Sequence, residues 1–495
     1  MTPASPAANT QTLGHLLGSL AAAPDVMING VTLDSRTIQG GELFLALPGD
    51  VHDGRHFIEQ AVASGAAAVV AQAPVAGFVD AVPVPLVEIP ELQHEAGVIA
   101  SRFYNEPSES LRLVGVTGTN GKTTVSRLAA QLARRLGRQC GVIGTLGASL
   151  DDSIVDAANT TPDAVALQRQ MAVWRDAGVD MVSMEVSSHA LVQGRVNGLA
   201  FDTAIYTNLS HDHLDFHGDM AAYGRAKLRL FQFAGLQSAV INFDDPFSSQ
   251  VVAALPEGVE VFGYSIHDHP SACISVSHAS WTAKGVEASI STPWGQGVFR
   301  SPLPGDFNLG NVAAAVASVV LAGESLEQVL AQVEHLSPVP GRLQSVPNDI
   351  GVQVIVDYAH TPDALEHVLA ALRPGVAGRL VTVFGCGGDR DAAKRPVMGC
   401  VACDGSDAVI VTSDNPRSEP PMAILLDIES GCRGDYRLVV DRAQAIAMAV
   451  AEAQPGDCVL IAGKGHEDYQ IIDDARIDFS DEAHAQSALA RRLQA

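Results

Sequence analysis

Short apolar runs alternate with amphipathic stretches along most of the chain, a pattern that predicts strands alternating with helices. The buried strand candidates span residues 111–116, 181–184, 203–207, 239–241, 352–356, 380–384, 408–411 and 459–461. Helical periodicity covers residues 123–136, 362–372 and 442–453. Strands that alternate with helices favour an α/β fold with doubly wound, mostly parallel sheets.

Two proline-containing segments interrupt this pattern and predict domain boundaries. They are Glu106-Pro107-Ser108 and Ser337-Pro338-Val339-Pro340-Gly341. Dividing the chain length by roughly 150 residues per domain also gives about three domains. We therefore expect a small α/β domain at 1–106, a central domain at 107–338 and a Rossmann-like domain at 339–495. Between Val259 and Pro302, β-like runs follow one another without helices, which indicates a smaller antiparallel addition to the central domain.

The composition narrows the class of protein. Hydrophobic residues make up 47% of the 495 residues, which excludes a wholly disordered chain. Lys plus Arg is 31 and Asp plus Glu is 56, which gives a formal charge of −25. A surface this negative repels phosphate backbones and argues against a general nucleic-acid binder. A small phosphorylated ligand stays possible, because one local glycine-rich or basic site can hold it.

Cysteine usage and hydropathy give expectations about location. The seven cysteines do not form a disulfide framework in so long a chain. Cys400 and Cys403 form one CxxC without a second pair nearby, so we interpret them as helix core rather than a zinc or redox motif. Met1 is not followed by a basic region and an apolar stretch. No run of about 18 apolar residues is present. We expect a soluble, cytoplasmic protein.

The strongest chemical signal is a glycine-containing loop between a strand and a helix. It consists of Gly118, Thr119, Asn120, Gly121, Lys122, Thr123 and Thr124. Backbone N–H groups in such a loop surround phosphate oxygens, and the helix N-terminus favours their charge. Lys122 would neutralise the β- and γ-phosphates, and Thr123 would ligate Mg²⁺. Gly115 lies one residue too far away for the standard spacing, and an ordinary glycine turn is the alternative interpretation.

Two further polar groups follow strands, where ligands gather in a doubly wound sheet. Glu185, next to Ser187-Ser188-His189, is placed to hold a metal near the phosphates; the alternative is a solvated acid. The run from Asn208 to Asp215 carries His211 and His213, with His217 close by. Zinc ligation or simple loop polarity would explain these histidines, and zinc is the weaker idea without an accompanying cysteine. Lys227 alone would be a helix-surface lysine.

Together these motifs resemble the Mur ligase family. The resemblance is carried by the Gly118–Thr124 loop, Glu185-Val186-Ser187-Ser188-His189, Asp212-His213-Leu214-Asp215, Lys227, Pro340-Gly341-Arg342 and Asp357-Tyr358-Ala359-His360-Thr361-Pro362. It covers nearly the whole chain in the expected order. Members are three-domain, ATP-dependent ligases that extend the peptide of the peptidoglycan precursor. The variant loop spacing is the family's own form.

The resemblance implies roles for residues in the central domain. Lys227 resembles the lysine that becomes a carbamate (N6-carboxylysine) and helps to hold a second Mg²⁺. A carbamate suits this role because it is an oxygen-donor anion. The catalytic residues implied are Lys122, Glu185, His213 and Lys227, and the metal-binding residues are Thr123, Glu185, His213 and Lys227. Residues implied around the nucleotide at the domain boundary are Asn311, Arg342 and Asp357.

The substrate contacts are also implied by the resemblance. The uridine side would involve Leu33, Ser35, Asp50, Val51 and His52, and the muramoyl-dipeptide Asn159, Thr160, Thr161, Ser187, Gln193 and Arg195. By sequence alone, Asp34-Ser35-Arg36 is a polar turn and residues 159–163 are a helix-start signal. The third domain supplies Arg390, Asp414, Asn415, Pro416, Arg417, Gly463 and Glu467. Asp-Asn-Pro is a common turn, but Asp-Asn-Pro-Arg resembles the family's signature for meso-diaminopimelate.

The expected activity is therefore ATP-dependent amide ligation. The resemblance implies that meso-2,6-diaminopimelate is added to UDP-N-acetylmuramoyl-L-alanyl-D-glutamate through an acyl phosphate, by a monomeric enzyme with about two Mg²⁺ ions. One alternative is a folylpolyglutamate synthetase-like ligase, although such relatives lack the N-terminal domain. Another is a P-loop regulatory or transport ATPase, which would not explain the carboxylate, histidine and lysine group.

Overall fold

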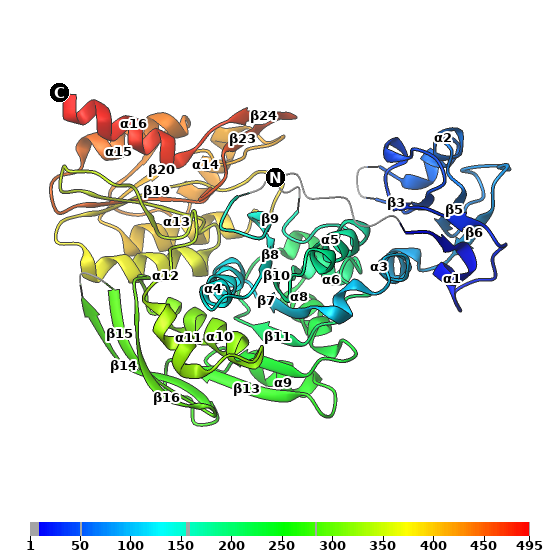
Figure 1. Ribbon diagram of the computed structural model, residues 1–495. Helices are drawn as coiled ribbons and strands as arrows, with labels where there is room; N and C mark the ends of the chain where they lie inside the picture. The colour runs from blue at the N-terminus through cyan, green and yellow to red at the C-terminus, as the bar shows by residue number, and fades with distance from the viewer. Residues whose placement is uncertain (1–8, 50–51, 155–158, 283–284, 495) are drawn as a thin grey trace.

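The computed structural model describes residues 9–49, 52–154, 159–282 and 285–494. Their strands form three main sheets that follow one another along the chain (Figure 1). Each sheet has hydrophobic clusters on both faces, because side chains of successive strand residues point to opposite sides. The α/β fold predicted from the alternating pattern is confirmed.

The N-terminal sheet is small and parallel, with the order β3-β4-β5-β6. In β4, Leu43 and Leu45 enter one buried cluster while Phe44 enters the other. The elements of this part are β1 (Gln11–Thr12), α1 (Leu13–Leu17), β2 (Met27–Ile28), β3 (Val31–Thr32), β4 (Leu43–Ala46), α2 (Ile58–Ala63), β5 (Ala68–Gln72), β6 (Leu86–Ile89) and α3 (Leu92–Phe103).

The central sheet has the order β16-β15-β14-β13-β12-β11-β7-β10-β8-β9. Six of its strands, β7, β8, β10, β11, β12 and β13, run parallel to one another. The edge strand β9 pairs with β8 in the antiparallel direction. The strands are β7 (Arg112–Thr117), β8 (Cys140–Gly144), β9 (Gly147–Ser149), β10 (Met181–Glu185), β11 (Thr203–Tyr206), β12 (Ser238–Asn242), β13 (Glu260–Ser265), β14 (Ile274–Thr282), β15 (Gly285–Thr292) and β16 (Gly295–Ser301).

The antiparallel segment expected between Val259 and Pro302 is present, but it is not a separate addition. β13 pairs in parallel with β12, and Tyr264 and Ser265 at its end pair with the start of β14. β14, β15 and β16 then continue the same sheet as an antiparallel meander. The end of β13 thus passes the sheet on to β14, although only its last two residues are paired with that strand.

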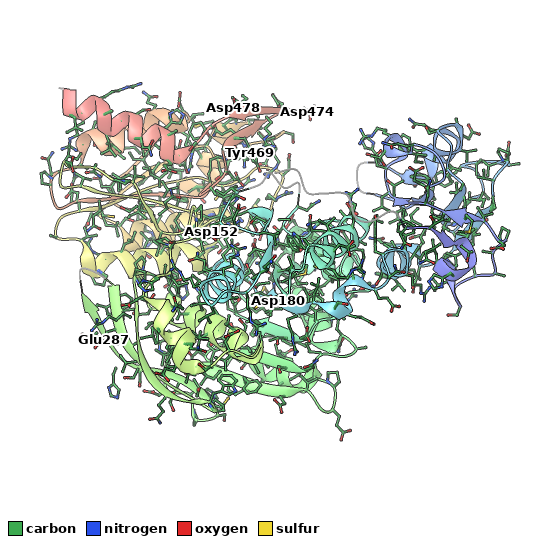
Figure 2. All side chains as sticks on the ribbon, in the orientation of Figure 1. Asp152, Asp180, Glu287, Tyr469, Asp474 and Asp478 are labelled. Carbon is green, nitrogen blue, oxygen red and sulfur yellow. The ribbon has the colours of Figure 1, made fainter. Side chains whose placement is uncertain are left out.

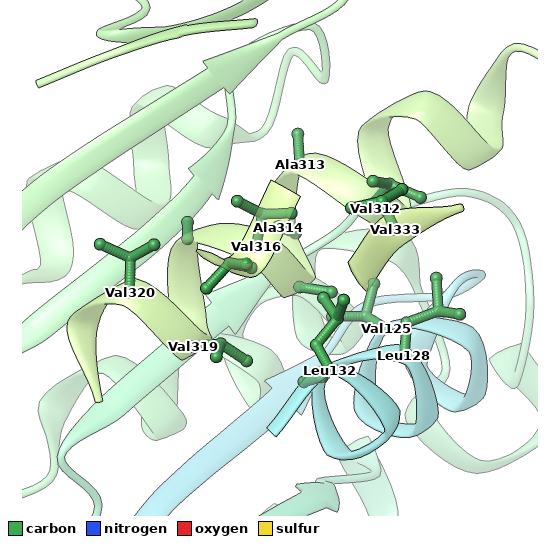
Figure 3. Close-up of a cluster of buried hydrophobic side chains, with 14 of the residues drawn as sticks. Val125, Leu128, Leu132, Val312, Ala313, Ala314, Val316, Val319, Val320 and Val333 are labelled. Atoms are coloured by element: carbon green, nitrogen blue, oxygen red, sulfur yellow. The ribbon is translucent and has the colours of Figure 1, made fainter. Parts of the chain in front are cut away.

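Helices cover both faces of the central sheet. They are α4 (Lys122–Arg135), α5 (Ala164–Asp176), α6 (Ser188–Val192), α7 (Leu214–His217), α8 (Met220–Leu228), α9 (Ser248–Ala254), α10 (Phe307–Leu321) and α11 (Leu326–Val333). Figure 3 shows the largest buried cluster, where Val125, Leu128 and Leu132 of α4 lie against valines and alanines of α10. Small side chains such as Ala313 and Ala314 allow the two helices to approach closely, so the start of α4 is firmly anchored.

The C-terminal sheet has the order β17-β18-β22-β19-β20-β21 and is parallel except for β17. This agrees with the Rossmann-like prediction. The elements are β17 (Gln344–Ser345), β18 (Gln353–Asp357), α12 (Pro362–Leu372), β19 (Leu380–Phe384), α13 (Lys394–Gly405), β20 (Ala408–Val411), α14 (Pro421–Glu429), β21 (Tyr436–Leu438), α15 (Arg442–Glu452), β22 (Cys458–Ala462), the hairpin β23 (Tyr469–Ile472) and β24 (Ala475–Asp478), and α16 (Asp481–Gln494).

The two cysteines of the CxxC lie in α13, as predicted, but not both in the core. Cys400 is exposed and Cys403 is half-buried. The buried face of α13 is formed instead by Met398 and Ala402, which are one turn apart. The core placement predicted for Cys400 is therefore wrong, because a spacing of three residues leaves the phase of the helix undetermined.

The negative charge is distributed over the surface. Figure 2 shows Asp152, Asp180 and Glu287 on different parts of the central domain. Their side chains are 64%, 50% and 48% exposed, so water solvates each of them. In the part of the chain that the structure describes, no helix is long and apolar enough to cross a membrane.

The domain boundaries at 106/107 and 338/339 stay predictions, and each sheet lies within one of the predicted domains.

The α4–α10 packing should dominate the stability of the central domain. Leu128→Ala should lower its free energy of unfolding by about 2–5 kcal/mol, because Leu128 is fully buried and leaves a cavity. Leu426→Ala, at a position 52% exposed, is the matched control and should change stability by less than about 1 kcal/mol. Urea denaturation measures both variants. Equal losses would contradict the assignment of this cluster as the main core.

Candidate active site

Three neighbouring strands of the central sheet end side by side and deliver the predicted site residues to one edge. β7 is the middle strand, with β10 and β11 on its two sides. Glu185 at the end of β10 pairs with Val116, and Tyr206 at the end of β11 pairs with Thr117. The glycine loop follows Thr117 directly, so it lies where the strand order reverses, the usual ligand position in such sheets.

The residues that follow β11 fix the conformation of the loop through hydrogen bonds. The N–H groups of Thr119 and Asn120 donate to the backbone and side-chain oxygens of Asn208, each at 2.8 Å. Thr207 Oγ1 donates to the carbonyl oxygen of Asn120 at 2.6 Å. Gly118 has φ +149°, and a Cβ there would lie 1.8 Å from Thr207 Oγ1, so no larger residue fits. Thr207 and Asn208 thus fix the loop.

Two lysines converge on the start of this loop. Lys122, the first residue of α4, donates to the carbonyl oxygens of Gly118 and Thr119 at 3.0 and 2.8 Å. Lys227 of α8 donates to the same Gly118 oxygen at 2.7 Å and is 1% exposed. Burial, and next the positive charge of Lys122, holds the pKa of Lys227 well below its usual range. This shift favours the neutral amine form of Lys227.

Glu185 lies beside the first turn of α4. Its Oε2 accepts from Thr123 Oγ1 at 2.9 Å, and its Oε1 accepts the N–H of Thr145 at 2.8 Å. The carboxylate is 1% exposed. Thr124 is the next helix residue and is half-buried. A carboxylate and a hydroxyl group in contact beside a phosphate-type loop are the oxygen ligands that Mg²⁺ prefers.

The Asp212-His213 pair lies on the other side of the loop. Burial lowers the pKa of His213 to about 3, although the negative charge of Asp212 acts to raise it. The imidazole of His213 is therefore neutral and able to bind a metal. His213 also lies edge-on to His189, with ring centres 4.9 Å apart. Over the described ranges, no group of three or more His, Cys, Asp or Glu side chains is arranged to hold a metal unaided. A cation here would need other oxygen donors.

The residues predicted around the nucleotide lie near the start of α4. Asn311 of α10 donates to the side chain of Asn308. Asn311 also lies against the loop, because a Cβ on Gly121 would be 2.8 Å from the Oδ1 atom of Asn311. Arg342 donates to Thr123 Oγ1 at 3.2 Å and stacks on the Tyr358 ring at 4.5 Å. Asp357, at the end of β18, accepts two backbone N–H groups, and burial raises its pKa. The structure thus brings segments far apart in sequence to one place.

The residues predicted for the muramoyl-dipeptide form a cluster behind Glu185. Thr161 Oγ1 donates to the carbonyl oxygen of Glu185 at 2.9 Å and accepts the N–H of Ser187 at 3.1 Å. Arg195 donates to the carbonyl oxygen of Thr161 at 2.9 Å. Thr160 Oγ1 lies 3.2 Å from that of Thr145, a partner of Glu185. Asn159 directly precedes Thr160 in the chain. Gln193 is the C-cap residue of α6, the helix that begins after Ser187.

The uridine-side residues are not part of this cluster. Leu33 and Ser35 lie after β3, and Ser35 Oγ donates to Gln60 at 3.3 Å within the N-terminal domain. This domain forms a separate lobe in Figure 1. His52 is exposed on it, while Asp50 and Val51 lie outside the described residues. Any substrate that contacts both places must be extended.

A pocket of about 210 Å³ joins the central and C-terminal domains. Its wall contains His213 together with Arg390, Asp414, Asn415, Arg417, Gly463 and Glu467, all of which were predicted from the sequence. Pro416 belongs to the same loop and is buried. Arg417 has φ +52° and donates to the carbonyl oxygen of Gly388 at 2.8 Å. A non-glycine residue in this strained conformation is typical of a functional loop.

The pocket also contains residues to which the sequence alone gave no role. Asp212 Oδ2 lies 3.8 Å from His360 Nε2, and its Oδ1 lies 3.7 Å from Lys394 Nζ. Burial would raise the pKa of Asp212, but His360, His213 and Lys394 together hold it well below its usual range. Asp212 and His360 stand in motifs already singled out. Lys394 begins a helix without any local signal, so only the fold identifies it.

Other polar contacts connect the C-terminal domain to the loop. Asp363 of α12 accepts from Asn120 Nδ2 at 2.7 Å and from Ser210 Oγ at 3.1 Å. His211 Nε2 lies 2.6 Å from Asp391 Oδ2. Since Asp391 also lines the pocket, the phosphate-type loop and the pocket share one interface.

Comparisons with known proteins agree with this architecture. The chain matches the family descriptions "Mur ligase family, catalytic domain" over residues 27–104, "Mur ligase middle domain" over 116–319 and "Mur ligase, glutamate ligase domain" over 341–465.

Several relatives bear the name UDP-N-acetylmuramoyl-L-alanyl-D-glutamate–2,6-diaminopimelate ligase. One, from Pseudomonas aeruginosa, is 48% identical over 471 residues, which is 95% of this chain and 96% of the relative. Another, from Coxiella burnetii, is 44% identical over 488 residues, covering 97% of this chain and all of the relative. A solved structure of the same title is 36% identical, with a TM-score of 0.69 and coverage of 98% and 99%.

Lys122 should be required for ATP consumption. Lys122→Ala removes the ammonium group beside the loop and leaves the backbone unchanged, so turnover should fall by about 10² or more. Arg135→Ala, at the exposed opposite end of α4, is the control and should keep its activity. Phosphate release measures both. A Lys122→Ala variant with near wild-type turnover would refute the phosphate-loop assignment.

Proposed function

The chain belongs to the Mur ligase family, and from this premise we propose that it joins meso-2,6-diaminopimelate to UDP-N-acetylmuramoyl-L-alanyl-D-glutamate with consumption of ATP. This is a step of peptidoglycan precursor synthesis. The observation that supports it most is the pocket that joins His213 beside the loop to Arg417 of the Asp-Asn-Pro-Arg segment. An activated carboxylate and an amino acid would meet there.

The first step activates the D-glutamyl γ-carboxylate. A carboxylate oxygen attacks the γ-phosphorus of ATP, the bond to the β-phosphate oxygen breaks, and an acyl phosphate and ADP result. Lys122 stabilises the charge that moves from the γ- to the β-phosphate, because its ammonium group already lies against the loop. The N–H groups at the N-terminus of α4 hold the phosphates, while those of Thr119 and Asn120 keep the loop in place through Asn208.

The second step forms the amide bond. An amine of diaminopimelate attacks the acyl carbon, the tetrahedral intermediate loses phosphate, and the amine proton is released. Asp212, His213 and His360 line the pocket, where they can orient this amine, and its proton passes to solvent or to the departing phosphate. Closure of the three domains around the substrates would exclude water, which would otherwise hydrolyse the acyl phosphate.

The residues beside the loop also fit divalent magnesium. The Thr123 hydroxyl and the Glu185 carboxylate, which are in contact, suit one such ion, and the neutral imidazole of His213 on the other side of the loop would serve a second. The depressed pKa of Lys227 favours the neutral amine, the form that attacks CO₂ to form a C–N bond and release a proton. The resulting carbamate would supply the missing anionic donor for a second ion. Bound Mg²⁺ neutralises phosphate charge during transfer.

The remaining expectations belong to the same proposal. Asn311, Arg342 and Asp357 bind the nucleotide, and the Thr160–Thr161 cluster binds the muramoyl-dipeptide. Leu33, Ser35 and the 50–52 segment bind uridine, and the extended substrate spans the two domains. We place the domain boundaries at 106/107 and 338/339, and the protein acts as a cytoplasmic monomer.

The deciding experiment is an amino-acid panel with ATP and UDP-N-acetylmuramoyl-L-alanyl-D-glutamate. Phosphate release should require both the UDP-linked dipeptide and diaminopimelate. Release with a folate and glutamate would indicate the folylpolyglutamate synthetase-like alternative. Release with ATP alone would indicate a P-loop ATPase without ligase activity.

Lys227 should function as a carbamate. Lys227→Ala should lose about 10² or more in turnover, and small carboxylic acids such as acetate should restore part of it by filling the vacated anion site. Removal of dissolved CO₂ should reversibly lower wild-type activity. ¹³C NMR after addition of ¹³CO₂ should detect the carbamate. Full activity with an unmodified lysine would refute this role.

Arg417 should select diaminopimelate over L-lysine. L-Lysine lacks the second carboxylate and would leave the partly buried guanidinium without its ligand, so wild-type kcat/KM should favour diaminopimelate by about 10³-fold or more. Arg417→Ala should remove most of this preference. Arg417→Lys keeps the charge but not the planar fork and should recover only a part. Equal use of L-lysine by wild-type enzyme, or unchanged selectivity in Arg417→Ala, would overturn the assignment.

A further inference from the structure

Lys464 lies in the turn that follows β22, behind the pocket, and has no role in the function proposed above. Its side chain is 0% exposed. Nζ donates to Glu467 Oε2 at 2.8 Å and to Asn415 Oδ1 at 3.1 Å. It also lies 5.3 Å from the centre of the Tyr469 ring, labelled in Figure 2. A buried ammonium group needs such partners, because an unpaired charge is costly to desolvate.

The two partners of Lys464 are themselves connected. Asn415 Oδ1 accepts from Lys464 and from the N–H of Ile471 at 3.0 Å. These two donors fix the orientation of the amide, so Asn415 Nδ2 donates in the opposite direction, to Glu467 Oε2 at 2.9 Å. Lys464, Asn415 and Glu467 thus form a closed triangle of hydrogen bonds.

The triangle uses only one oxygen of Glu467. Both side-chain donors reach Oε2, and no hydrogen bond or ion pair from another described residue reaches Oε1. Glu467 and Asn415 line the pocket, whereas Lys464 lies behind them. Asp414 and Arg417 line the same end. Glu467 therefore has one saturated oxygen and one that is open to a ligand.

We propose that Lys464 is a positioning residue that holds Glu467 through Oε2, so that Oε1 receives the non-reacting ammonium group of diaminopimelate. This inference rests on the proposed function, because that function supplies the ligand. An ammonium group at Oε1 meets the carboxylates of Glu467 and Asp414, while Arg417 takes the carboxylate on the same carbon. Without Lys464, Glu467 would lose its buried cation and its fixed orientation.

The test is a comparison of Michaelis constants in the full-length enzyme. Lys464→Met should raise KM for diaminopimelate about 10- to 100-fold, on the scale of one truncated buried charge pair. KM for ATP and for the UDP-linked dipeptide should stay within about twofold. Arg437→Met is the control, since Arg437 lies on β21 in an exposed ion pair with Glu452 and is not part of the pocket wall. It should leave all three constants unchanged.

A ligand and a second variant identify the partner of Lys464. 2-Aminopimelate lacks the non-reacting ammonium group. For this ligand, Lys464→Met and wild-type enzyme should therefore have the same kcat/KM. Glu467→Gln should raise KM for diaminopimelate as Lys464→Met does, and the double variant should be less than about threefold worse than either single variant. Independent, multiplying effects would overturn the proposal. Lys464→Gln, which keeps a hydrogen-bond donor, serves if Lys464→Met does not fold.

The outcomes separate the two levels of the argument. A wild-type enzyme that does not ligate diaminopimelate overturns the proposed function and this inference together. An active wild-type enzyme with an unchanged KM in Lys464→Met overturns the positioning role alone. If Lys464→Met lowers the Tm and reduces activity toward all substrates equally, Lys464 has only a structural role, and the positioning role is again overturned.

Discussion

Two lysine side chains share one backbone oxygen at the centre of this protein. Lys122 and Lys227 donate to the Gly118 carbonyl at 3.0 and 2.7 Å. A single carbonyl dipole cannot balance two neighbouring positive charges, so the arrangement requires one neutral lysine or added anions. Phosphate groups and a carbamate are anions of the right kind. The chemistry proposed for the site follows from this imbalance, since each anion it binds relieves the repulsion.

The rest of the central domain keeps these groups in place. The loop is fixed by Thr207 and Asn208 from the next strand, and α4 is anchored through its contacts with α10. Glu185 joins the loop to the predicted dipeptide segment through Thr123 and Thr161. A rigid set of hydrogen bonds costs no rearrangement when charge develops, which is the physical basis of electrostatic catalysis.

The C-terminal domain is connected to the same loop by polar contacts. Asp363 accepts from Asn120, and Arg342 donates to Thr123. Both partners in the central domain belong to the glycine loop or to the first turn of α4, so the third domain contacts the place where phosphate would bind. The amino-acid pocket lies in this interface, and its shape therefore depends on how the two domains meet.

The sequence determined the features that depend on neighbouring residues. The strand, glycine loop and helix around Gly118–Thr124, the polar ends of β10 and β11, and the α/β alternation were all predicted, because strand burial and helix starts have local signatures. The family resemblance added roles for Lys227, Arg342 and Arg417, and the pocket contains Arg417 as expected.

Only the tertiary structure decided which of these residues meet. Lys227 reaches the Gly118 oxygen across 109 residues, and Asp363 reaches Asn120 across 243. Lys394 has no distinguishing local pattern. Lys464 stands in the glycine-containing segment Gly463-Lys464-Gly465-His466-Glu467, which follows a strand but does not show where the lysine side chain lies; one lysine lines the pocket and the other lies buried behind it. Their roles depend on desolvation and on partners from other strands. Both arise from long-range packing, which a local pattern does not encode.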